Sequence, residues 1–255
     1  MRLKDIALKV NRKLLHLRLQ PIRVFCFHGV VGDTNENNPD SIPTSFFMGT
    51  IQQLLDSGYK FISLKDAYVH IKDDKIRMNK YAVLTADDGL KCQLDVLTWL
   101  EERNIPITLS LNVLSLSNKV CSLPYRKWYH IEDKDTEKHY AEQLYISESE
   151  LQEIKSDLVS FALHGVNHDE PATEISLGDF RQDVEACIQK FSSSKHYVPF
   201  YAYKYGKHNR NTDEVLRQYS ITPILVDGEM NYNDASYIHR ESLETLYKKC
   251  QPKLS

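Results

Sequence analysis

The chain has 255 residues, of which 42% are hydrophobic and 26% are charged, a composition typical of globular proteins. Its 32 basic and 35 acidic residues give a net charge of −3, which leaves no electrostatic case for nucleic acid as the main partner. The five cysteines are scattered and form no CxxC pair, so they predict free thiols in a reducing compartment rather than a disulfide framework or a zinc–thiolate site.

The first 20 residues predict a basic amphipathic helix. Apolar residues recur at helical spacing from Leu3 to Leu17, with lysines and arginines between them. Packing against a single domain formed by residues 21–255 is the plainer interpretation, and peripheral contact with an anionic membrane surface is the alternative. No small-residue cleavage site follows an apolar core here, so we expect a cytoplasmic protein, with the inner membrane face as the place of any membrane contact.

Short apolar runs alternate with helical patterns along the rest of the chain. The runs predict strands at residues 23–27, 59–62, 81–85, 105–112, 158–163, 198–203 and 221–226. Helices are expected at residues 46–55, 64–71, 93–102, 148–156, 177–191 and 211–219. Residues 115–145 carry many aromatic and charged residues and read as an irregular insertion over one face. The alternation predicts parallel strands in a closed or nearly closed α/β barrel, with its chemistry at the carboxyl ends of the strands.

Two adjacent carboxylates, Asp87 and Asp88, follow a predicted buried strand and precede Gly89. Buried charges of this kind need a cation or strong hydrogen-bond donors. Because neighbouring residues in an extended segment point to opposite sides, one carboxylate could bind a metal while the other faces a substrate. A simple turn or helix cap is the alternative, since Asp-Gly is a common turn dipeptide.

Two histidines, His164 and His168, follow another predicted buried strand at a spacing of four residues. In a helical turn this spacing places both rings on one side, where they suit a single metal ion. Two unrelated surface histidines are the alternative in a chain with ten. Two histidines and one aspartate form the donor set expected for zinc, with cobalt, nickel or iron as alternatives, and leave positions open for water and substrate.

With these motifs in order, the chain resembles the polysaccharide deacetylase family, the NodB-homology group of carbohydrate esterases. Residues 85–89 read T-A-D-D-G against the family's T-F-D-D-G, and residues 164–168 read H-G-V-N-H against H-S/T-x-x-H. Residues 201–206 read Y-A-Y-K-Y-G against the F-A-Y-P-Y-G of the poly-N-acetylglucosamine subgroup. The resemblance spans roughly residues 23–246 and implies a distorted (β/α)7-type barrel in which residues 21–255 form the catalytic domain.

The resemblance implies a role for each motif residue. Asp87 corresponds to the general base, and Asp88, His164 and His168 correspond to the ligands of one divalent metal ion. The metal activates water and polarises the acetyl carbonyl. The backbone N–H of Tyr205 corresponds to the donor that holds the oxyanion. The expected reaction releases acetate from an N-acetylated glycan or a lipid-linked sugar.

Other positions are less well defined by the resemblance. The family's closing L-x-x-H motif, which supplies the proton donor, is not evident; His239 and His28 are the two candidates. Lys204 replaces a proline and is expected to contact an anionic substrate group, with a solvated side chain as the alternative. Tyr203 is expected to bind substrate as an aromatic platform for a sugar, although a core position is equally consistent with the sequence.

Three readings of the function differ in reaction or class. The leading hypothesis is a metal-dependent N-deacetylase of an acetylated sugar. An O-acetyl esterase or a cyclic-amide hydrolase would use the same metal site on another bond. A carbohydrate-binding barrel without catalytic activity is the third hypothesis, and the intact motif residues argue against it.

Overall fold

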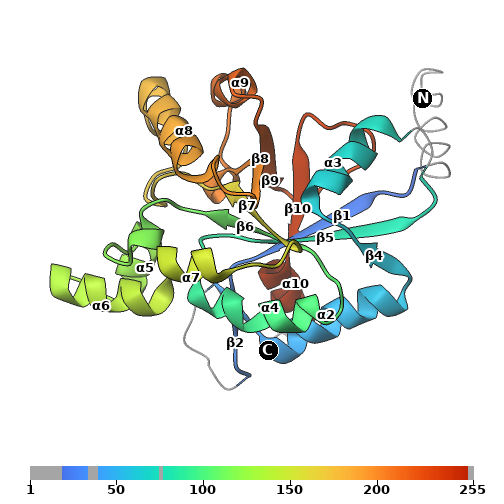
Figure 1. Cartoon of the computed structure of the whole chain (residues 1–255), viewed down its shortest axis with the longest axis horizontal. Coiled ribbons are helices and arrows are strands. Elements are labelled where there is room, and N and C mark those ends of the chain that lie inside the picture. The colour runs from blue at the N-terminus through green and yellow to red at the C-terminus, as the bar shows by residue number, and fades with distance from the viewer. Residues whose placement is uncertain (1–18, 34–39, 75–76, 252–255) are drawn as a thin grey trace.

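The structure is a computed structural model that describes residues 19–33, 40–74 and 77–251. Within this part of the chain, seven parallel strands close into a barrel (Figure 1). In order around the barrel they are β1 (Ile22–Phe27), β5 (Lys80–Ala86), β6 (Ile107–Leu111), β7 (Val159–Leu163), β8 (Tyr197–Ala202), β9 (Thr222–Val226) and β10 (Ile238–Ser242). The barrel closes because β1 pairs with both β5 and β10. The predicted (β/α)7-type barrel is therefore confirmed.

Two further pairings lie beside the barrel. The short strand β4 (Tyr59–Phe61) pairs with the first residues of β5, whereas β6 pairs with the last ones. Strands β2 (Gly29–Val31) and β3 (Ser41–Pro43) form a separate two-stranded sheet. Strands β5 and β6 read KYAVLTA and ITLSL and are buried along nearly their whole length, as expected for parallel strands covered by helices.

Helices surround the barrel strands (Figure 1). They are α2 (Thr44–Asp56), α3 (Leu64–Asp73), α4 (Leu94–Glu101), α7 (Glu148–Glu153), α8 (Leu177–Phe191), α9 (Arg210–Gln218) and α10 (Leu243–Cys250). Helix α8 shows why they pack, since Phe180, Val184 and Phe191 recur on one face and are buried. A capping box of Ser147 and Glu150 sets the start of α7, within the predicted helix at residues 148–156.

The segment 115–145, expected to be irregular, is mostly helical. It contains a 3-10 turn η2 (Ser115–Ser117) and the helices α5 (Leu123–Trp128) and α6 (Lys134–Leu144), which lie together beside α7 (Figure 1). The prediction failed because α6 buries only Ala141 and therefore shows no apolar periodicity. Its start is set instead by Asp133, whose carboxylate accepts from two backbone N–H groups of the first turn.

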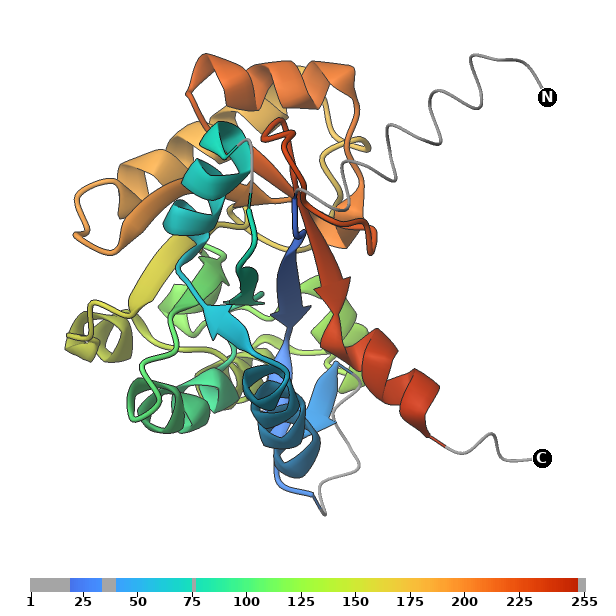
Figure 2. The ribbon, with the colours of Figure 1, turned by 90° about the vertical axis from the view of Figure 1, so that its right-hand side faces the viewer.

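The last strand and helix, β10 and α10, were not predicted from the sequence. Figure 2 shows β10 beside β1 and running directly into α10. Strand β10 reads IHRES, which contains one apolar residue, so it carries no hydrophobic pattern of a buried strand. Its place is decided by its neighbours β1 and β9, between which it completes the barrel.

Because the barrel strands are parallel, their carboxyl ends meet at one mouth of the barrel. His28 follows β1, Asp87 follows β5, His164 follows β7 and Tyr203 follows β8. The expected amphipathic helix of residues 1–20 lies almost wholly outside the described residues. Among the described helices, none combines the length and the apolar character that crossing a membrane requires.

Candidate metal centre and active site

The turn after β5 directs two adjacent carboxylates to different partners. Asp88 has a φ of 72° and Gly89 a φ of 67°, so both lie in the left-handed region. Aspartate tolerates this region better than most residues, and a Cβ at position 89 would come within 2.9 Å of a leucine side chain of β6. The buried Gln93 amide donates to the backbone oxygens of Asp87 (2.6 Å) and His28 (2.7 Å), which ties this turn to the end of β1.

The Asp87 carboxylate forms a bidentate pair with Arg240 of β10. The two guanidinium nitrogens donate to Oδ1 and Oδ2 at 2.7 Å each, and both side chains are buried. Burial acts to raise the pKa of Asp87, but the charge and hydrogen bonds of Arg240 and the charge of His28 together outweigh it and hold the pKa well below its usual value. Asp87 is therefore an ionised, oriented carboxylate. This arginine comes from β10, which was not among the predicted strands.

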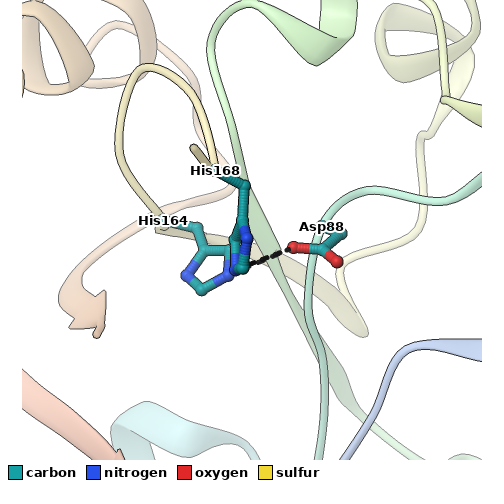
Figure 3. A group of neighbouring side chains, drawn as sticks. All are labelled: Asp88, His164 and His168. Carbon is teal, nitrogen blue, oxygen red and sulfur yellow. Dashed lines mark ion pairs between the residues drawn. The ribbon is translucent and has the colours of Figure 1, made fainter. Parts of the chain in front are cut away.

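Asp88 lies against the two predicted histidine ligands. Figure 3 shows the three side chains converging. Asp88 Oδ1 lies 3.2 Å from His164 Nε2 and 3.6 Å from His168 Nε2. One donor atom from each residue lies within 4.8 Å of the others, and all three residues are buried. The structure therefore brings together the three residues that the sequence predicted as ligands.

The chemistry of the two rings fits a divalent cation. His164 Nδ1 donates to the backbone oxygen of Ala202 at 2.8 Å, so in the neutral ring the lone pair is on Nε2. Within the described residues, this buried Nε2 makes no hydrogen bond. Burial lowers the pKa of His168 to about 4, so its ring is neutral at neutral pH. Two imidazoles and one carboxylate match the donor set that zinc prefers.

The two histidines are held by a loop, not by the helical turn that their spacing suggested. Gly165 has a φ of 91°, which breaks any helix immediately after His164. The loop is joined to the chain after β6, because the backbone N–H groups of Val113 and Leu114 donate to the oxygens of Gly165 (3.1 Å) and Val166 (2.8 Å). The convergence of the ligands thus depends on neighbouring strands rather than on helix geometry.

Two predicted tyrosines line the site in different ways. Tyr205 is 49% exposed, its ring packs edge-to-face on His168 at 4.7 Å, and its hydroxyl donates to the His168 backbone oxygen at 2.9 Å. Its φ of 57° turns the backbone at the mouth of the barrel. Tyr203 is buried, and its hydroxyl donates to Asp213 at 3.1 Å. Both contribute to the wall of the cavity described below.

Lys204 is buried and is not among the described residues that line the cavity at the metal ligands. Its side chain is 2% exposed, and its ammonium donates to the backbone oxygen of Asn167 at 3.0 Å. Asp183 Oδ1 lies 3.7 Å from the same nitrogen. This placement argues against the expected contact with an anionic substrate group, because the ammonium is already buried and paired.

His28 faces the carboxylate pair and is itself paired with Glu244 of α10. Glu244 Oε1 accepts from the His28 backbone N–H at 2.7 Å and lies 3.2 Å from Nδ1. Burial acts to lower the pKa of His28, but the hydrogen bond and charge of Glu244 outweigh it and raise the pKa to about 10. The imidazole is therefore protonated at neutral pH. Glu244 is a second site residue that the sequence analysis missed.

His239, the other candidate proton donor, is placed differently. It precedes Arg240 on β10, so its side chain points to the opposite face of that strand. Its Nδ1 pairs with Asp227 at 2.7 Å. It is not among the described residues that line the cavity at the metal ligands. This geometry argues against His239 as the proton donor and favours His28.

A cavity of about 330 Å³ joins these groups at the mouth of the barrel. It is lined by His28, Asp40, Asp87, Asp88, Pro124, Tyr125, His164, His168, Tyr203, Tyr205, Gly206 and Val226. The insertion contributes Pro124 and Tyr125, and the Tyr125 hydroxyl donates to Asp88 Oδ2 at 3.4 Å. The predicted base, the metal ligands and His28 thus share one concave site.

Comparison with known proteins agrees with this site. A family model described as polysaccharide deacetylase matches residues 74–224, which include Asp87, Asp88, both histidine ligands and Tyr205. The chain belongs to the polysaccharide deacetylase family, and the resemblance drawn from its motifs is confirmed. It is accordingly a carbohydrate deacetylase by family. No curated protein sequence matches the chain significantly.

Solved structures share the fold at low sequence identity. A de-N-acetylase from Aggregatibacter actinomycetemcomitans has a TM-score of 0.71 at 17% identity, covering 90% of this chain and 99% of that one. IcaB from Ammonifex degensii has a TM-score of 0.67 at 19% identity, covering 88% and 91%. The deacetylase PplD from Streptococcus pyogenes, solved with acetate, has a TM-score of 0.67 at 16% identity, covering 92% and 99%. These likenesses independently support the barrel fold.

Proposed function

We propose that this protein is a metal-dependent hydrolase that removes N-acetyl groups from an acetylated sugar. The observation that carries the proposal is the meeting of Asp88, His164 and His168 in one cavity with an ionised Asp87 and a protonated His28. The fold shared with a protein named a de-N-acetylase supports an N-acetyl rather than an O-acetyl substrate. An acetylated glycan or a lipid-linked sugar remains the proposed substrate class.

A single divalent cation is proposed at the Asp88–His164–His168 group, with zinc as the first candidate and cobalt, nickel or iron as alternatives. Bound there, the cation supplies Lewis acidity that polarises the acetyl carbonyl and activates water for attack. The protein's own part is to present two imidazoles and one carboxylate, each of which has a contact that orients it. Ala202 fixes the His164 ring, Tyr205 supports His168, and Tyr125 contacts Asp88.

Asp87 is the proposed general base. The Arg240 pair keeps it ionised and fixes the direction of its carboxylate. It takes a proton from the attacking water as the new C–O bond forms at the acetyl carbon. The oxygen anion that develops on the acetyl group is proposed to accept a hydrogen bond from the backbone N–H of Tyr205. Tyr205 is one of the residues that line the same cavity.

His28 is the proposed general acid. The C–N bond breaks as the imidazolium donates a proton to the leaving nitrogen, which gives a free amine and acetate. Glu244 holds the ring in place and keeps it protonated until that step. The proton taken up by Asp87 leaves through solvent as His28 is reprotonated, so the cycle is balanced for hydrolysis of one amide by one water.

The direct test measures acetate release from N-acetylated and O-acetylated sugars together with the metal content of the purified protein. We expect acetate from the N-acetylated substrate and about one divalent ion per chain. Asp87→Asn removes the base while leaving all three ligands, so turnover should be lost and the metal retained. Full activity of this variant would mean that the assigned base is wrong. A purified wild-type protein that binds no divalent metal would contradict the metal-dependent mechanism.

A further inference from the structure

The ligand loop, defined as residues 164–168, contacts a largely buried ion pair whose two residues do not line the cavity at the metal ligands. Lys204, 2% exposed, donates to the Asn167 backbone oxygen at 3.0 Å and lies 3.7 Å from Asp183 Oδ1. Asn167 directly precedes the ligand His168. The ammonium therefore fixes the peptide that leads into one of the metal ligands.

Asp183, from α8, binds the preceding residue of the same loop. Its Oδ1 accepts from the backbone N–H of Val166 at 2.9 Å, and its Oδ2 accepts from the Tyr201 hydroxyl at 3.1 Å. The Asp183 side chain is 12% exposed. Together, Lys204 and Asp183 hold two successive residues of the ligand loop, one through its N–H and the other through its carbonyl.

Gly165 leaves the space that this ion pair fills. A Cβ at position 165 would lie 2.9 Å from Lys204 Nζ and 3.1 Å from Asp183 Oδ2. A side chain there would displace the ammonium from its bond to the loop, in addition to the strain of a φ of 91°. Glycine at 165 and lysine at 204 both depart from the family motifs, and they are in contact. The buried position of the lysine requires that residue 165 has no side chain.

The rest of the ligand loop is held as well, so Lys204 completes a set of anchors. Gly165 and Val166 accept from the chain after β6, and the His168 oxygen accepts from the Tyr205 hydroxyl. Without Lys204 the Asn167 carbonyl would lose its side-chain donor. Because outer-shell contacts orient metal ligands, a loose peptide at this point would let the His168 ring move away from Asp88 and His164.

We propose that Lys204 and Asp183 form a positioning pair that holds the ligand loop in its metal-binding geometry and so sets the affinity of the site for its cation. The inference rests on the proposed metal centre. A buried ion pair by itself is weak evidence of a stabilising role, since desolvation offsets much of the attraction. Here both partners form hydrogen bonds with the loop that carries the ligands, so the pair can position that loop as well as contribute to stability.

The experiment measures metal affinity directly, without using catalysis. Metal-free wild type, Lys204→Met and Asp183→Asn are titrated with Zn²⁺ against a competing chelator, and the visible spectrum of the Co²⁺ form reports the ligand geometry. Lys207→Met is the matched control, because Lys207 pairs with Glu174 at 2.6 Å on the surface, with both side chains about half exposed. The double variant Lys204→Met/Asp183→Asn completes a cycle.

We expect each single variant to bind Zn²⁺ about 10–100-fold more weakly and to change the Co²⁺ spectrum, while the control matches the wild type. The double variant should lose less than the product of the two single losses. Thermal unfolding of the metal-free proteins separates folding from positioning. Lower stability with unchanged metal affinity and spectrum would show a merely structural pair and overturn the inference. A wild type that binds no metal would overturn the proposed metal centre itself.

Discussion

The Asp87–Arg240 pair is the buried interaction whose loss should be most costly. Arg240 is 0% exposed and Asp87 is 4% exposed at their side chains, so Arg240→Met leaves an interior carboxylate without its bidentate partner. Breaking a buried pair in this way costs about 3–5 kcal/mol, which for a domain of this size corresponds to a fall in Tm of about 6–20 °C. The full cost is present at neutral pH, because an unfolded aspartate ionises near pH ~3.9.

The measurement is thermal unfolding of the metal-free protein, so that a bound cation does not compensate Asp87. Arg23→Met is the matched control. Arg23 of β1 and Glu241 of β10 likewise form a bidentate pair, with N–O distances of 2.7 and 2.8 Å. Their side chains, however, are 24% and 14% exposed. A pair with this access to solvent should contribute about 1 kcal/mol or less.

Activity gives a second readout of the same change. Without Arg240, burial is offset less, so the pKa of Asp87 should rise by about 1–3 units. A base is inactive when protonated, and the acid limb of the pH–rate profile should therefore move to higher pH. Equal losses of stability in Arg240→Met and Arg23→Met, with no movement of the acid limb, would refute the assigned role of the pair.

Three further outcomes follow from the site. His28 has its pKa raised to about 10 by Glu244, so its contribution to stability is fully present below pH ~6.5 and is lost as the pH rises through about 10. Glu244→Gln should lower the alkaline pKa of kcat/KM by about 1–3 units; an unchanged alkaline limb would exclude His28 as the acid. Gly165→Ala should destabilise the metal-free protein by about 1–3 kcal/mol and weaken Zn²⁺ binding, which unfolding and chelator competition would measure, and wild-type values for both would contradict the packing argument. Zn²⁺ at 100 times its Kd should stabilise the wild-type protein by about 2.7 kcal/mol, and a chelator should reverse this in a melting experiment, whereas His168→Ala should show little response.

Much of the barrel was predictable because its strands are buried on both faces. Runs such as residues 81–84 are continuously hydrophobic, which indicates a buried parallel strand without any tertiary information. The strand ends then placed Asp87, Asp88 and His164 at one mouth, as the structure confirms. The same reasoning failed for β10 and α6, where few residues are apolar and the elements are set by neighbours and caps.

The chemistry of the ligands was visible in the sequence, but their support was not. His164 and His168 were predicted from helical spacing, whereas a loop turned by Gly165 carries them. The spacing gave the right residues because motif order and strand position constrain them independently of helix geometry. Lys204 read as a cation near substrate, and its burial under the loop depends on the absence of a side chain at position 165.

The amino-acid sequence alone determined which reactive groups exist and at which end of the barrel they lie, since parallel strands deliver their carboxyl ends to one place. The tertiary structure decided which distant partners tune them. Arg240 meets Asp87 across 153 positions and Glu244 meets His28 across 216. The physical reason is that a charged side chain acquires its partner only when the barrel closes, and no local pattern of hydrophobic residues encodes that closure.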